Sequence, residues 1–337
     1  MVSQFLVKSL RKVVAIAAIA LLATSCSGVF LSSTESNPWK VIDTANDATF
    51  SDVAFTGDRN HGWLVGNHNT LLETLDGGNT WVSKSLDLEG NHTLTSVSFA
   101  DQEGWVTGQP SLLLHTKDGG QSWERIQLSA KLPGEPFMIT ALGPNSAEMA
   151  TDVGAIYVTQ NSGSNWTALV EAAIGVLRNI NRSEDGQYVA VSSRGNFYST
   201  WQPGQRTWQP HNRQNSRRLQ NMGFSADGNF WLIARGGQIR FGTNADTEEW
   251  QDPINPELST SWGLLDIAYR TADEIWVSGG SGSMLYSPDG GKSWQKDSAL
   301  ENVPSNLYRI VFISPDQGFV MGQRGILLKY EGDPQSV

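Results

Sequence analysis

The chain has 337 residues, of which 17% are charged, and its formal net charge at pH 7 is −10. The ordinary content of aliphatic and aromatic residues excludes a wholly disordered chain, and the single cysteine excludes both an internal disulfide framework and a multi-cysteine metal site. The acidic balance argues against a general nucleic-acid-binding protein, because neutralising phosphates needs an excess of lysine and arginine.

Residues 1–25 are typical of a bacterial lipoprotein signal peptide. Basic residues precede an apolar run over 13–22, which is too short to cross a bilayer as a permanent helix, and Cys26 follows several small residues. We therefore predict lipidation at Cys26 and a flexible tether over 26–38. An ordinary secretory signal with a chance cysteine is the alternative, because two residues before the cysteine depart from the commonest lipoprotein pattern.

The rest of the chain is built from a repeat of about 42 residues. Three copies end in the phrase (S/T)-x-D-x-G-x-x-W, the Asp-box, over 74–81, 116–123 and 287–294, and a degenerate copy covers 159–166. The final tryptophan of the phrase recurs at intervals of 42 to 44 residues, at Trp39, Trp81, Trp123, Trp166, Trp208, Trp250 and Trp294.

Each repeat also contains three short apolar or alternating runs upstream of its tryptophan, separated by an acidic turn and a glycine-rich turn. Four short strands in a unit of 40–45 residues are typical of a propeller blade. The last unit stops at Tyr330 without a fourth strand, and residues 38–42, which precede the first unit, match the missing strand. We predict an all-β domain over 39–337, a seven-bladed β-propeller of four-stranded antiparallel blades whose ring is closed by the N-terminal strand.

The repeated residues are predicted to be structural. The aspartates Asp76, Asp118 and Asp289 recur symmetrically, which favours acceptance of hydrogen bonds from turn amides over catalysis. We expect the tryptophans to be buried between neighbouring blades. The five histidines show no metal-ligand spacing, and no cofactor motif is present, so the sequence predicts neither a metal nor a cofactor.

Nine of the fifteen arginines lie between 178 and 240, a stretch without lysine that has a net charge of +6. Arginine without lysine favours bidentate recognition of carboxylates or polar backbone. Because turns alternate between the two faces of a propeller, most of these arginines are predicted to meet on the face opposite the Asp-boxes, around blades 4 and 5. Arg206 is the expected exception. Acidic residues concentrate in the turns of the Asp-box face.

The signal, the seven repeats, the order of intact and degenerate Asp-boxes and the central arginines resemble the photosystem II stability/assembly factor family of cyanobacteria and chloroplasts. The resemblance implies a non-enzymatic factor, lipid-anchored on the lumenal side of the thylakoid membrane. It also implies binding of the newly made photosystem II reaction-centre core subunit and early assembly intermediates during assembly and repair. We expect the protein to be a monomer. The arginine-rich patch of the family would correspond to Arg178, Arg182, Arg194, Arg213, Arg217, Arg218 and Arg235.

Two other functions remain open from the residues. One is an Asp-box glycoside hydrolase, either sialidase-like or glucanase-like. Tyrosines available as its nucleophile are Tyr188, Tyr198, Tyr269 and Tyr308, but no tyrosine–glutamate pair is recognisable in the sequence. The other is an exported propeller scaffold for a different protein partner.

Overall fold

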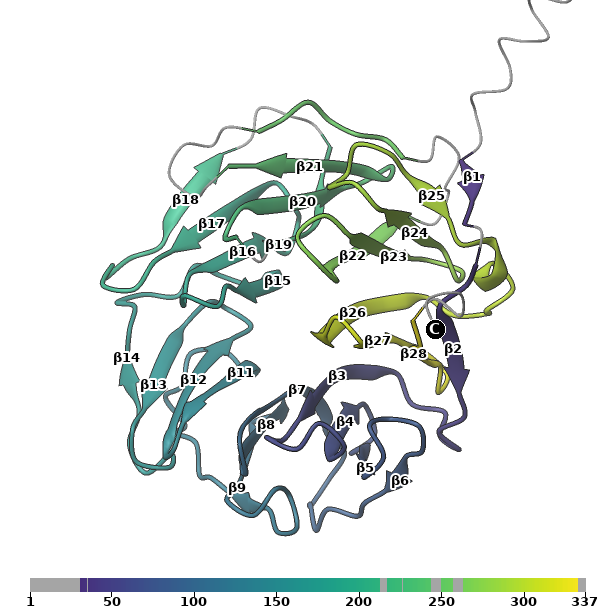
Figure 1. The fold of residues 1–337 in the computed structure, drawn as a ribbon. Coiled ribbons are helices and arrows are strands. Elements are labelled where there is room, and N and C mark those ends of the chain that lie inside the picture. The colour runs from purple at the N-terminus through teal and green to yellow at the C-terminus, as the bar shows by residue number, and fades with distance from the viewer. Residues whose placement is uncertain are drawn as a thin grey trace, which may run out of the picture.

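The computed structural model describes residues 31–34, 36–212, 217–225, 227–243, 250–256 and 263–332. Seven small sheets are arranged radially around a common centre, with the first strand of each sheet innermost (Figure 1). The predicted seven-bladed β-propeller is therefore confirmed. We number the blades 1 to 7 in chain order.

The first four blades each contain four antiparallel strands. Blade 1 contains β3 (Phe50–Phe55), β4 (Gly62–Gly66), β5 (Leu71–Thr74) and β6 (Val82–Ser83). Blade 2 contains β7 (Thr93–Ala100), β8 (Glu103–Gln109), β9 (Leu112–Thr116) and β10 (Glu124–Arg125). Blade 3 contains β11 (Pro136–Gly143), β12 (Ser146–Thr151), β13 (Ile156–Thr159) and β14 (Thr167–Ala168). Blade 4 contains β15 (Leu177–Arg182), β16 (Tyr188–Ser192), β17 (Phe197–Trp201) and β18 (Gln209–Asn212).

The last three blades are less uniform. Blade 5 contains β19 (Leu219–Phe224), β20 (Phe230–Ala234) and β21 (Gln238–Gly242). Blade 6 contains β22 (Leu264–Tyr269), β23 (Ile275–Gly279), β24 (Met284–Ser287), β25 (Gln295–Lys296) and the added β1 (Ser32–Ser33), and a single 3-10 turn, η1 (Ser298–Leu300), follows β25. Blade 7 contains β26 (Leu307–Ser314), β27 (Gln317–Gly322), β28 (Leu327–Tyr330) and β2 (Trp39–Ile42).

The ring is closed as predicted, by an N-terminal strand. In blade 7, β2 pairs antiparallel with β28, and Trp39 lies opposite Tyr330. Figure 1 shows β2 and β28 side by side, next to blade 1. This pairing joins the two ends of the propeller, and it covers the edge that β28 would otherwise expose.

Two blades differ from the predicted four antiparallel strands. In blade 5, the described residues after β21 form two isolated bridges in place of a fourth strand, Gly242 to Trp250 and Ile239 to Ile254. Pro253 beside Ile254 has no amide hydrogen to donate, which limits further pairing. Blade 6 gains β1, which pairs parallel with β25. Residues 32–34, which belong to the segment predicted as a flexible tether, are therefore fixed to the propeller along β25.

The Asp-box turns have the structural role predicted for them. In blade 1, Asp76 Oδ1 accepts hydrogen bonds from the amides of Asn79 and Thr80, both at 2.9 Å. The Thr74 hydroxyl donates to Asp76 and accepts from the amide of Gly78. Burial alone would raise the pKa of Asp76, but hydrogen bonds from Thr80, Thr74 and Asn79 outweigh it and lower the pKa to about 2.

Asp-box glycines connect one blade to the next. Gly120 of blade 2 lies on the indole ring of Trp63 in blade 1, and the Trp63 indole N–H donates to the carbonyl of Gly119 at 2.8 Å. Trp81 is buried and packs on Phe319 of blade 7, between two blades. The predicted burial holds for four of the seven repeated tryptophans, which are Trp39, Trp81, Trp208 and Trp294. The other three, Trp123, Trp166 and Trp250, are half-buried.

This packing predicts that Gly120→Ala destabilises the propeller. A Cβ at Gly120 would lie 2.3 Å from the Trp63 ring, and the backbone there has a φ of +93°. The expected cost is about 1–3 kcal/mol for overpacking, added to the backbone strain. Gly90→Ala is the matched control, because Gly90 has a φ of +87° but no neighbouring atom within 4 Å of the added Cβ. Urea unfolding of both variants measures the difference, and equal stabilities would contradict this account of the blade contact.

Candidate partner-binding surface

Five of the predicted arginines lie at the same face of the propeller. Arg194 is in the turn between β16 and β17, and Arg235 is in the equivalent turn of blade 5. Arg217 and Arg218 directly precede β19, and Arg178 is the second residue of β15. All five are exposed. We call these five residues the arginine surface.

Backbone hydrogen bonds hold the loops of the arginine surface together. The amide of Arg235 donates to the carbonyl of Arg218 at 2.8 Å, which joins two loops of blade 5. The amide of Leu219 donates to the carbonyl of Gly195 at 2.9 Å, which joins blade 5 to the turn that carries Arg194. The arginines of both blades are therefore attached to one fixed backbone framework.

The side chain of Arg178 crosses from blade 4 to blade 5. Its Nη1 donates to Gln220 Oε1 at 2.7 Å, and its Nη2 donates to the carbonyl of Ser193 at 3.0 Å. A guanidinium has five N–H donors, so these two bonds leave donors for a ligand while fixing the direction of the group. Arg217 is also near a neighbour, with its Nη1 3.5 Å from Asn255 Oδ1.

Arg182 is separate from the arginine surface. It is the last residue of β15, at the end next to the β15–β16 turn, and its side chain is only 13% exposed. Its Nε donates to Glu148 Oε1 at 2.7 Å. The charge of Arg182 is therefore used inside the propeller, between blades 3 and 4. Arg213 and Cys26 lie outside the described residues.

The opposite face carries the exposed acidic turns, as predicted. Arg206 lies on this face, in the turn between β17 and β18, and pairs with Glu171 at 3.1 Å. Hydrogen bonds between the first-to-second turns and the Asp-box turns, such as Gly77 to Asn60 and Gly119 to Gln102, fix the face to which each turn belongs. The acidic residues exposed in these first-to-second turns are Asp58, Asp101, Glu184, Asp185, Asp227, Asp273 and Asp316.

The structure adds an apolar residue that the sequence did not single out. Val176 lies in the connection before β15 and is 62% exposed, and its carbonyl accepts a hydrogen bond from the amide of Ser193 next to Arg194. An apolar contact beside guanidinium groups suits a peptide with both acidic and apolar side chains. Only the topology brings Val176 to this face, because the connection has no periodic pattern.

A tyrosine–glutamate pair that was not recognisable in the sequence is present inside the propeller. The Tyr188 hydroxyl donates to Glu148 Oε1 at 2.8 Å, beside Arg182. Tyr188 is 1% exposed, and burial together with the charge of Glu148 raises its pKa well above the usual value. A buried tyrosine held in its protonated form is unsuited to act as the nucleophile of a glycosidase.

The innermost strands place a ring of polar side chains at the centre of the propeller. Asp52 accepts from the Ser96 hydroxyl at 2.8 Å and the Val97 amide at 3.1 Å, and Arg309 of blade 7 lies 3.3 Å from Asp52. These contacts connect successive blades. The register of the innermost strand shifts at the same position in every blade, at Phe50/Asp52, Leu94/Ser96, Pro136/Met138, Leu177/Asn179, Leu219/Asn221, Leu264/Asp266 and Leu307/Arg309.

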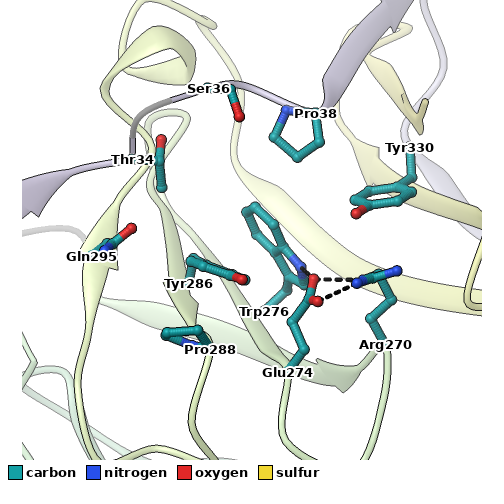
Figure 2. Close-up of a pocket in the computed structure, with 10 residues that line it drawn as sticks. All are labelled: Thr34, Ser36, Pro38, Arg270, Glu274, Trp276, Tyr286, Pro288, Gln295 and Tyr330. Carbon is teal, nitrogen blue, oxygen red and sulfur yellow. Dashed lines mark hydrogen bonds and ion pairs between the residues drawn. The ribbon is translucent and has the colours of Figure 1, made fainter. Parts of the chain in front are cut away.

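A cavity of about 310 Å³ lies at the seam between blades 6 and 7 (Figure 2). Blade 7 has no Asp-box turn, because its fourth strand comes from the N-terminus, so Trp276 lacks the glycine turn that covers Trp63. Glu274 accepts from the Trp276 indole and from Arg270 Nε, at 2.9 and 2.6 Å. The Arg270 guanidinium also lies 5.4 Å from the centre of the Tyr330 ring. Arg270 is therefore committed to internal contacts, unlike the arginine surface.

In the described part of the chain, no group of three or more histidine, cysteine, aspartate or glutamate residues is placed to hold a metal ion. No helix within the same residues is long and apolar enough to cross a bilayer.

Comparison with known proteins gives consistent matches over almost the whole chain. The model of the family described as photosynthesis system II assembly factor YCF48 matches residues 31–331. The photosystem II assembly lipoprotein Ycf48 of Trichormus variabilis is 59% identical over 327 residues, covering 97% of this chain and 96% of the relative.

Two solved structures are similar over most of their length. A structure described as YCF48 bound to D1 peptide has a TM-score of 0.88 and 53% identity, and the match covers 90% of this chain and all of that one. YCF48 from Cyanidioschyzon merolae has a TM-score of 0.82 and 40% identity, and the match covers 89% of this chain and 99% of that one.

Asp266, on the innermost strand of blade 6, also belongs to the ring of polar side chains at the centre of the propeller. Its ionisation predicts that the stability of the fold depends on pH. Burial raises the pKa of Asp266 to about 6. The Ile310 and Ile267 amides, the Asn221 side chain and the charge of Arg309 each lower this pKa, but burial outweighs them. The folded protein therefore binds this proton more tightly than the unfolded chain does. The side chain favours folding below pH 4, and this contribution is lost as the pH rises through 6.

Asp266→Asn removes the ionisation and should stabilise the protein relative to the wild type more at pH 8 than at pH 4, by up to about 3 kcal/mol. Urea unfolding at both pH values measures the change. Parallel pH profiles for the two proteins would show that Asp266 does not titrate in this way.

Proposed function

The chain belongs to the Ycf48 family of photosystem II assembly factors, and on that premise we propose that it binds the D1 reaction-centre subunit through the arginine surface. The solved relative described as bound to a D1 peptide supports D1 as the partner. The observation that carries the proposal is the convergence of five exposed arginines from two blades on one hydrogen-bonded framework. Newly made D1 and early assembly intermediates are the proposed forms of the partner.

The residues proposed to contact D1 are Arg178, Arg194, Arg217, Arg218 and Arg235, together with Arg213, which the sequence places in the same connection as Arg217 and Arg218. The bidentate geometry of guanidinium groups suits carboxylates and backbone carbonyls of an extended segment. Arg182 is assigned a positioning role instead, because its pairing with Glu148 joins blade 4 to blade 3.

We also propose that the protein is a monomeric, non-enzymatic factor, held on the lumenal side of the thylakoid membrane by lipid on Cys26. The name lipoprotein that curated relatives carry supports the anchor. Two observations support a binding function over a glycosidase. The family is described as an assembly factor, and Tyr188 is buried.

The test is the affinity of the purified propeller for peptides that tile the D1 segments outside the membrane. The triple variant Arg217→Ala, Arg218→Ala and Arg235→Ala should bind at least about 100-fold more weakly, because each lost anchor contact costs about 1 kcal/mol or more. Its affinity should also depend less on salt, because fewer charge pairs are left to be screened.

The matched control removes three exposed arginines elsewhere, with Arg59→Ala, Arg125→Ala and Arg206→Ala, and should leave the affinity near that of the wild type. A lysine triple at 217, 218 and 235 keeps the charge and should recover only part of the affinity, because lysine cannot bind bidentately. Equal affinities of the arginine-surface and control variants would contradict the proposal.

A further inference from the structure

We infer that the outer edge of blades 5 and 6 is the membrane-proximal edge of the propeller, so that the arginine surface meets its partner close to the lipid. The inference rests on the lipid anchor of the proposed function.

Residues 31–34 are fixed to the outer edge of the ring. Ser32 and Ser33 pair with Gln295 and Lys296 of β25, the outermost of the four antiparallel strands of blade 6, and the amide of Thr34 donates to the carbonyl of Lys296 at 3.0 Å. Leu31 is half-buried and packs on the hydrophobic core between blades 5 and 6. Figure 1 shows β1 outside the ring, beside β25.

The chain between the anchor and this attachment point is short. Leu31 follows Cys26 by five residues, which span at most about 18 Å when fully extended. A compact domain of roughly 300 residues has a radius of gyration of about 19 Å and is about 50 Å across. The tether is therefore much shorter than the propeller is wide, and the attached edge must stay near the membrane surface.

Charge disfavours the two orientations in which the propeller would lie flat. One would press the acidic Asp-box face on the lipid. The other would press the arginine face on the lipid. The charge of that face is divided, because blades 4 and 5 carry the arginine surface, whereas the connections into blades 1 and 2 expose Asp43, Asp47, Asp87 and Glu89. An anionic bilayer attracts the first half and repels the second.

The tether and the charge pattern therefore act in the same direction. The tether holds blades 5 and 6 near the bilayer, and the charge pattern brings blades 4 and 5 toward it and turns blades 1 and 2 away. Both therefore place blade 5 close to the lipid. Arg217, Arg218 and Arg235 are in blade 5, one of the two blades whose shared core Leu31 contacts, on the face opposite the Asp-box turn that precedes β25. A membrane-embedded partner would then meet the arginine surface with segments that extend only a short distance from the bilayer.

The experiment uses the full chain, acylated at Cys26, on vesicles of phosphatidylcholine and phosphatidylglycerol that contain a lipid with a headgroup nitroxide quencher. Acylation blocks the only native thiol, so a single added cysteine can be labelled with a fluorophore. Asp252→Cys places the label at the outer edge of blade 5, and Ala168→Cys places it on β14 at the far edge; both positions are exposed.

The label at 252 should be quenched several-fold more strongly than the label at 168. Inserting about 20 Gly/Ser residues between Cys26 and Leu31 gives a tether of about 25 Å root-mean-square length and should reduce the difference while vesicle binding persists. Equal quenching at 252 and 168 with the native tether would overturn the inference.

Failure of the acylated chain to sediment with vesicles would overturn the anchor and the orientation together. The D1-binding proposal is tested separately, by peptide affinity in solution with a chain that begins at residue 31. A negative orientation result therefore does not bear on the arginine surface.

Discussion

The structure depends on the closure of the ring at blade 7. Four residues of β2 pair with four residues of β28 and join parts of the chain almost 290 residues apart. Once the ring is closed, every blade has two fixed neighbours. The contacts of Gly120 with Trp63 and of Arg309 with Asp52 both depend on this arrangement, and the second spans the closing seam between blades 7 and 1.

Closure also determines which charged side chains meet. In antiparallel blades the turns alternate between faces, so a residue's position within its repeat decides its face. The arginine surface combines loops of blades 4 and 5, and the hydrogen bonds of Arg178 hold one guanidinium in place before any ligand arrives. Pre-organised groups lose less conformational entropy on binding, which favours affinity over an equal number of mobile arginines.

Much of the fold follows from the sequence because the repeat is read directly from the tryptophan spacing and the Asp-box glycines. The faces of Arg194, Arg235 and Arg206 also follow, because each lies in a turn whose direction the strand count fixes. The pairing of β1 with β25 could not be predicted, because Ser32 and Ser33 have no pattern that indicates a strand. The limited pairing of the fourth strand of blade 5 could be predicted from Pro253, because proline has no amide hydrogen to donate to a neighbouring strand.

Long-range side-chain pairs limit how much of the site can be predicted. Arg182 and Glu148 are 34 residues apart, and nothing in either repeat marks them as partners. Arg182 is the final residue of β15, so its side chain lies between blades 3 and 4 instead of beside Arg178. Val176 is the opposite case, an apolar residue that the fold leaves exposed next to charged ones.

The central claim is that D1 is recognised at the arginine surface, and hydrogen exchange of the propeller with and without a bound D1 peptide tests it most directly. Amides in the turns around Arg194 and Arg235, and in the chain entering β19, should exchange more slowly in the complex, whereas the Asp-box turns should be unchanged. Protection confined to the Asp-box turns, with none at the arginine surface, would contradict the account.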